Sequence, residues 1–154
     1  MKRIGVFPGS FDPFTKGHED ILRRFIPLFD EVIIAIGVNT SKQYMFSLES
    51  RMAQINSLFK GDDKVKIEPF HKLTVEFCKD KKAQYLLRGI RNATDADYER
   101  SIAQMNFDLS GIETLFLMCD PALAPINSSI IREIKRNGGD ISLFVTNDEL
   151  LIIK

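Results

Sequence analysis

Residues 9–18, which read Gly-Ser-Phe-Asp-Pro-Phe-Thr-Lys-Gly-His, decide the fold, because they join a short apolar strand to an amphipathic helix. The preceding run Ile4-Gly5-Val6-Phe7 is typical of a buried strand. After the stretch, apolar residues recur at helical spacing, namely Ile21, Leu22, Phe25, Ile26 and Phe29. His18 is therefore expected at or near the start of a helix, where free backbone N–H groups and the helix dipole favour an anion. This order predicts a phosphate site in an α/β protein.

The phosphate site lacks the two glycine-spaced nucleotide fingerprints. No G-x-G-x-x-G follows the strand, and the chain contains no G-x-x-x-x-G-K-[ST]. Instead, Thr15-x-Gly17-His18 puts a small residue before the histidine, so that a phosphate could approach the backbone closely. Taken alone, a histidine at a helix start is more often a cap or a surface residue.

Length and composition indicate one domain spanning residues 1–154, with 44% hydrophobic residues to fill a core. The formal net charge is zero and the pI is about 6.7, whereas a nucleic-acid binder is usually more basic. The sequence has neither a signal peptide nor a stretch long enough to span a membrane, so we expect a cytoplasmic protein. Cys78 and Cys119 lie far apart in apolar contexts and are interpreted as reduced packing residues.

Strand-like and helix-like segments alternate along the whole chain. We expect strands at residues 3–7, 32–38, 65–69, 84–88 and 114–118, and helices at residues 18–29, 48–59, 74–81, 95–109, 128–136 and 148–153. Pro27 is expected to kink the first helix or to end it early. The alternation predicts a single-domain, Rossmann-like α/β fold with a five-stranded parallel sheet and helices on both faces.

Polar clusters follow each expected strand. Open parallel sheets bind ligands outside the carboxyl ends of their strands, so these loops should converge on one edge. Each of them carries at least one Lys or Arg, and the five loops are residues 10–18, 39–42, 71–74, 88–92 and 120–132. This edge is therefore a candidate polyphosphate site.

A second motif lies near the C-terminus, where residues 126–132 read Ile-Asn-Ser-Ser-Ile-Ile-Arg. Taken alone, Ser128 and Ser129 make a good helix N-cap. Together with T-x-G-H, however, the motif resembles the nucleotidyltransferase superfamily. Closer details resemble its bacterial phosphopantetheine adenylyltransferase family over nearly the whole chain, namely Gly9 to Pro13, Ser41-Lys42, Arg88-Gly89-Ile90-Arg91 and Asp97-Tyr98-Glu99.

The resemblance implies transfer of AMP from ATP to 4′-phosphopantetheine, with Mg²⁺ accompanying the nucleotide and homohexamers as the assembly. It assigns His18 to the phosphates of ATP as the catalytic residue. The other residues that it assigns to ATP are Ser10, Phe11, Gly89, Ile90, Arg91, Glu99, Leu123, Ala124, Pro125, Ile126, Asn127, Ser128 and Ser129. The acceptor side comprises Ser10, Lys42, Thr74 and Arg88.

Several of these residues also have plainer interpretations. Arg88 and Arg91 could belong to a solvated loop, and Lys42 could be one of many surface lysines. Glu99 should lie on the exposed side of its helix, where a simple surface carboxylate competes with a role in binding ribose. His71 lacks a partner motif and is taken as structural or peripheral.

The chain departs from the family pattern at two positions and in one loop. Ser10 stands where the family usually has Thr, which keeps the hydroxyl and loses a methyl group. Asn127 replaces the first serine of I-S-S-S, and its larger amide could shift a phosphate. The loop of residues 120–125 lacks the aromatic residue that the family often has there.

Three other functions compete with this one. The first is a related nucleotidyltransferase with another phosphorylated acceptor, such as nicotinate mononucleotide or glycerol phosphate. The second is a non-catalytic nucleotide sensor, and the third is an enzyme that handles tRNA, against which the short chain and neutral charge count.

Overall fold

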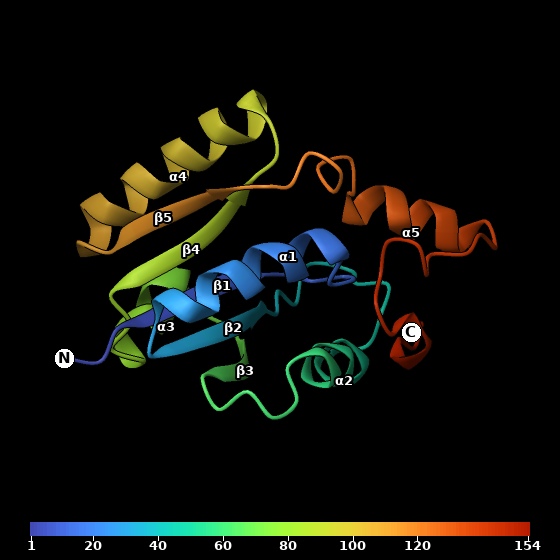
Figure 1. Cartoon of the computed structure of the whole chain (residues 1–154), viewed down its shortest axis with the longest axis horizontal. Helices are drawn as coiled ribbons and strands as arrows, with labels where there is room; N and C mark the ends of the chain where they lie inside the picture. The colour runs from blue at the N-terminus through green and yellow to red at the C-terminus, as the bar shows by residue number, and fades with distance from the viewer.

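Five parallel strands form one sheet in the order β3-β2-β1-β4-β5 in the computed structural model, which describes residues 1–154 (Figure 1). The strands are β1 (Ile4–Gly9), β2 (Glu31–Gly37), β3 (Val65–Phe70), β4 (Tyr85–Ile90) and β5 (Glu113–Met118). All four pairings are parallel. The predicted Rossmann-like α/β class is confirmed.

The sheet is covered by helices on both faces, as predicted. The helices are α1 (Lys16–Phe25), α2 (Leu48–Leu58), α3 (Thr74–Asp80), α4 (Ala93–Ser110) and α5 (Ser128–Arg136), with 3₁₀ turns η1 (Ile26–Leu28) and η2 (Asp148–Leu150). Figure 1 shows α1 crossing in front of β1 and β2, while α3 lies behind them. None of these helices combines the length and the apolar character that crossing a membrane requires.

Two apolar clusters pack against opposite faces of the sheet because successive strand residues point to opposite sides. Phe7 and Ile34 join the cluster under α1 and α2, which also holds Leu22. Their neighbours Val6 and Ile33 join the cluster under α3. A third, smaller cluster lies beyond the sheet and joins α5 to the C-terminal segment.

Some predicted boundaries are wrong. Helix α1 ends at Phe25 and is followed by the 3₁₀ turn η1. Pro27 therefore ends the helix early, which was one of the two expected effects of this proline. The expected helix at residues 148–153 is a single 3₁₀ turn, after which Ile153 forms a β-bridge with Phe46. Strand β4 runs to Ile90, so Arg88 belongs to a strand and not to the following loop.

The sheet opens between β1 and β4, where the strand order reverses direction. Strand β1 pairs with β2 at six positions but with β4 at only two, Gly5 with Tyr85 and Val6 with Leu86. The carboxyl halves of β1 and β4 therefore diverge, and their ends point toward α5 (Figure 1). Such a switch point is where open α/β sheets bind ligands.

Candidate functional site

His18 lies in the first turn of α1, as predicted, and is part of a reciprocal helix cap. Thr15 is the N-cap residue, and its Oγ1 accepts from the backbone N–H of His18 at 3.3 Å. In return, the backbone N–H of Thr15 donates to Nδ1 of His18 at 3.0 Å. Because Nδ1 accepts this bond, the proton of the neutral imidazole resides on Nε2.

The imidazole of His18 packs against three aromatic rings on its protein side and lines the first cavity on the other. The centroids of Phe11 and Phe14 lie 5.2 and 5.3 Å from its own, and that of Phe7 lies 6.4 Å away. This burial, together with the positive charges of Arg88 and Arg91, lowers the pKa of His18 to about 3. His18 is therefore neutral near pH 7 and can donate a hydrogen bond from Nε2.

The turn before His18 is shaped by tight packing. Phe11 adopts φ of +47°, and a Cβ at Gly9 would lie 2.7 Å from its ring, so only glycine fits there. Buried Asp12 accepts from the backbone N–H groups of Met45 and Phe46 at 2.8 and 2.9 Å. This carboxylate ties the turn to the loop that carries Lys42.

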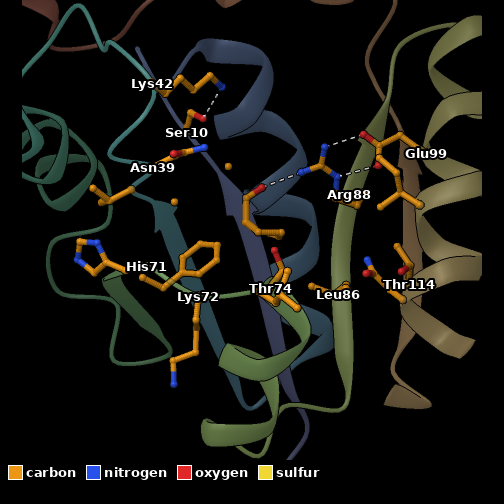
Figure 2. A pocket seen from close by; sticks show the side chains of 18 of the residues that line it. Ser10, Asn39, Lys42, His71, Lys72, Thr74, Leu86, Arg88, Glu99 and Thr114 are labelled. Atoms are coloured by element: carbon orange, nitrogen blue, oxygen red, sulfur yellow. Dashed lines mark hydrogen bonds and ion pairs between the residues drawn. The ribbon is translucent and has the colours of Figure 1, made fainter. Parts of the chain in front are cut away.

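Arg88 spans the opening between β1 and β4. Its Nη1 donates to the carbonyl of Pro8 at 2.7 Å, while Nε and Nη2 donate to the two carboxylate oxygens of Glu99 at 2.9 and 2.6 Å (Figure 2). Glu99 is only 8% exposed, so the expectation that it lies on the exposed side of its helix was wrong. Helix α4 packs on β4 and β5, and this packing turns Glu99 inward.

Helix α5 closes the other side of the opening. Its N-cap is Asn127, not a serine, and the Oδ1 of Asn127 accepts from the backbone of Ser129 and Ile130. The Ser128 hydroxyl donates to Pro13 O at 3.0 Å, and Arg132 donates to Asp12 O at 2.8 Å. The two sequence motifs, more than a hundred residues apart, are thus in direct contact.

Two cavities lie side by side at this edge of the sheet. The first, of about 610 Å³, is lined by His18, Arg91 and residues of α5. The second, of about 710 Å³, is lined by residues that follow β2 and β3 (Figure 2). The lining residues that both cavities share are Pro8, Gly9, Ser10, Lys42, Arg88 and Glu99.

The predicted site residues gather around these cavities, and Ser10, Lys42, Arg88 and Glu99 line both of them. All four acceptor-side residues, Ser10, Lys42, Thr74 and Arg88, line the second cavity, and Nζ of Lys42 lies 3.4 Å from Oγ of Ser10. The predicted ATP residues that line the first cavity are Ser10, Phe11, His18, Gly89, Arg91, Glu99, Leu123, Ile126, Asn127, Ser128 and Ser129. Ile90, Ala124 and Pro125 lie outside its lining.

Comparison with known proteins gives one consistent family. Residues 6–134 match the family described as Cytidylyltransferase-like. The phosphopantetheine adenylyltransferase of Christiangramia forsetii is 49% identical over 145 residues, which cover 94% of this chain and 95% of that protein. The chain belongs to the phosphopantetheine adenylyltransferase family. The family's protein from Flavobacterium psychrophilum is 51% identical, with 93% of this chain and 95% of that protein covered.

A solved structure of a less similar protein has the same fold. The bifunctional NMN adenylyltransferase/ADP ribose pyrophosphatase of Francisella tularensis, in complex with AMP and manganese, superposes with a TM-score of 0.66. At 22% identity this likeness concerns the fold alone. It covers 98% of this chain, which spans only 46% of that protein.

Sequence reasoning missed several residues of this family member's site. Asp95, in the first turn of α4, lines the first cavity and forms an ion pair with Arg91, which precedes that helix. Arg132 was part of the quoted motif but received no role, and it also lines that cavity. His71, taken as structural or peripheral, lines the second cavity. Arg51 gave no sequence signal, yet it is buried and donates to Ser10 O at 2.6 Å.

Proposed function

We propose that this chain transfers AMP from ATP to 4′-phosphopantetheine, giving dephospho-coenzyme A and pyrophosphate. A phosphate oxygen of the acceptor attacks the α-phosphorus of ATP and forms a new P–O bond. The bond from the α-phosphorus to the α–β bridging oxygen breaks, and that oxygen leaves with pyrophosphate. No protein nucleophile is needed, so positioning and electrostatic stabilisation carry the rate.

The observation that carries this proposal is the meeting of the two cavities at Ser10, Lys42 and Arg88. An in-line transfer needs donor and acceptor phosphates to touch at one point, with each substrate extending away from it. The first cavity takes ATP, and the second takes the extended pantetheine arm. The two cationic side chains at the junction neutralise the phosphates that approach each other there.

His18 donates from Nε2 to the phosphates of ATP and stabilises charge that develops during transfer. Support comes from its neutral imidazole, whose Nδ1 is already occupied by the backbone of Thr15. Arg91 and Ser129 bind phosphates of ATP. The nucleoside is surrounded by other residues that line the first cavity, namely Gly89, Leu123, Ile126, Asn127 and Ser128. Lys42, Thr74 and Arg88 hold the acceptor.

Magnesium enters this proposal through the nucleotide. Mg²⁺ supplies positive charge that neutralises the phosphates and orients them. No group of three or more His, Cys, Asp or Glu side chains lies together in a way that could hold a metal. We expect the ATP phosphates to carry most of the ligands of this cation, so chelation with EDTA should abolish turnover.

The protein is proposed to assemble as a homohexamer in the cytoplasm. Apolar side chains that are well exposed on α4 and β5 support an assembly, and they include Met105, Leu109 and Met118. Cys78 and Cys119 are both free thiols, in keeping with a reducing compartment.

The function is tested by pyrophosphate release from ATP and Mg²⁺ with each acceptor in turn. We expect release with 4′-phosphopantetheine and at most a background rate with nicotinate mononucleotide or glycerol phosphate. Release with nicotinate mononucleotide alone would favour the related transferase, and ATP binding without release from any acceptor would favour a sensor. The Arg88→Ala variant is the control for adventitious activity, because it removes one of the two cations that line both cavities.

A further inference from the structure

Two carboxylates on α4 hold the two site arginines in the same way. Arg91 donates from Nε and Nη2 to the carboxylate of Asp95 at 2.8 and 3.3 Å, and its Nη1 donates to the carbonyl of Ile126 at 3.4 Å. Arg88 uses the same three nitrogens on Glu99 and on the carbonyl of Pro8. Asp95 and Glu99 are four residues apart, so they occupy the same side of α4.

The hydrogen-bond count of Arg91 leaves donors for a ligand. A guanidinium carries five N–H groups, and three of them are used by Asp95 and Ile126. The remaining two reside on the terminal nitrogens Nη1 and Nη2. Because Arg91 and Asp95 both line the first cavity, a phosphate there can be reached by these two groups.

Asp95 restrains both the backbone and the side chain of Arg91. Its Oδ2 also accepts from the backbone N–H of Arg91 at 3.1 Å. An unrestrained arginine loses up to about 2 kcal/mol of side-chain entropy when it is immobilised. Because the Asp95 carboxylate already orders the Arg91 side chain in the folded protein, less side-chain entropy is lost when a nucleotide binds.

We propose that Asp95 is a positioning residue for Arg91, which it aims at the phosphates of the nucleotide without touching the substrate itself. This proposal rests on the proposed function, in which ATP occupies the first cavity. The competing role is purely structural, because Asp95 lies in the first turn of α4 and accepts a backbone N–H beside its N-terminus. The two roles make different predictions when Arg91 is absent.

The test is a double-mutant cycle on Asp95→Asn and Arg91→Ala. Asn keeps one carbonyl oxygen for the backbone N–H of Arg91 but loses the second acceptor and the negative charge. We expect Asp95→Asn to lower kcat/KM for ATP by roughly tenfold or more, with KM for 4′-phosphopantetheine changed less than about twofold. In the Arg91→Ala background, the same change should cost less than about twofold.

Asp97→Asn is the matched control, because Asp97 is an exposed acid on the same helix and lines neither cavity. It should leave both substrates' kinetic constants unchanged. If Asp95→Asn does not fold, Asp95→Glu replaces it, because Glu keeps the charge while displacing the guanidinium. Thermal unfolding of each variant reports the structural contribution.

Full additivity of the two substitutions would overturn the proposal, as would equal losses for ATP and for the acceptor. The same double-mutant cycle can be measured without turnover, by calorimetric titration of each variant with ATP in the absence of acceptor. A protein that binds ATP and shows the coupling, but releases no pyrophosphate with 4′-phosphopantetheine, would therefore contradict the proposed function and leave the role of Asp95 supported.

Discussion

At the residue scale, the protonation state of His18 determines what its side chain can do. The rings of Phe11 and Phe14 flank the imidazole and reduce its hydration, and two arginines nearby disfavour a further positive charge. Protonating Nδ1 would also break the hydrogen bond that Nδ1 accepts from the backbone N–H of Thr15, because the two N–H groups would then point at each other. His18 is thus held as a neutral imidazole with its proton on Nε2, which fits the proposed role of a fixed donor.

His18→Ala should lower kcat by about a hundredfold or more, the loss typical of removing one donor to a developing oxyanion. ATP binding should weaken far less, because the donor acts mainly in the transition state. Steady-state kinetics and calorimetric ATP titration measure the two effects. His71→Ala serves as the control for removing an imidazole from the neighbouring cavity, and equal turnover in parent and His18→Ala would contradict the role.

The lowered pKa of His18 also predicts a pH dependence of stability. The folded pKa of about 3 lies below the ordinary value of 6.5, so between these pH values the unfolded chain binds the proton that the folded chain excludes. This group therefore costs stability as pH falls through 6.5. From pH 7 to pH 5, the parent should lose about 2 kcal/mol of unfolding free energy relative to His18→Asn.

Urea unfolding of the parent and His18→Asn at both pH values measures this difference. Carboxylates titrate in both proteins, so their contribution cancels in the comparison. A stability difference that stays constant from pH 7 to pH 5 would show that the folded pKa of His18 is near its ordinary value.

At the scale of elements, the C-terminal segment supports the acceptor loop, by which we mean residues 39–47, the loop that contains Lys42. The backbone N–H of Ser47 donates to Ile152 O, and that of Lys154 donates to Met45 O, both at 2.9 Å. On its other side, the same loop is held by the Asp12 carboxylate. Residues 44–47, just after Lys42, are therefore held by hydrogen bonds to Asp12 on one side and to residues 152–154 on the other.

Deleting residues 152–154 should raise KM for 4′-phosphopantetheine several-fold while changing KM for ATP less, because these hydrogen bonds lie next to Lys42. Two backbone hydrogen bonds are lost, and we expect a stability loss of about 1–3 kcal/mol. Lys154→Ala is the control, since it keeps the backbone N–H of residue 154. Equal changes in both KM values would contradict a local effect on the acceptor loop.

At the scale of the whole molecule, the apolar surface on α4 and β5 is the main candidate for subunit contact. Leu109 is 64% exposed and does not line either cavity. Leu109→Glu should shift the sedimentation coefficient to a smaller species, because burying an unpaired charge in an interface is costly. Leu28→Glu, at a residue 52% exposed on η1, should leave the assembly unchanged. A parent that sediments as a monomer would contradict the hexamer.

Much of this arrangement was predictable because its signals are local. The strand before Gly9 and the helix after Thr15 follow from apolar spacing, and Pro27 marks the end of α1 through its missing N–H. Helix α5 was predicted with its observed bounds, Ser128–Arg136, although its cap is Asn127. The helix expected at residues 148–153 was wrong beyond its first turn, because Ile153 pairs with Phe46 through a tertiary contact.

The sequence by itself determined the alternating α/β order, the strand–turn–helix unit that contains His18 and the family resemblance, since all three depend on neighbouring residues. Only the tertiary structure decided how Arg88 and Arg91 are held. Glu99 turned inward because α4 packs on β4 and β5, and Asp12 joined two loops that are distant in sequence. Strand order also arose at this level, and the short pairing of β1 with β4 opened the site. These features depend on contacts between distant segments, which periodicity along one segment does not encode.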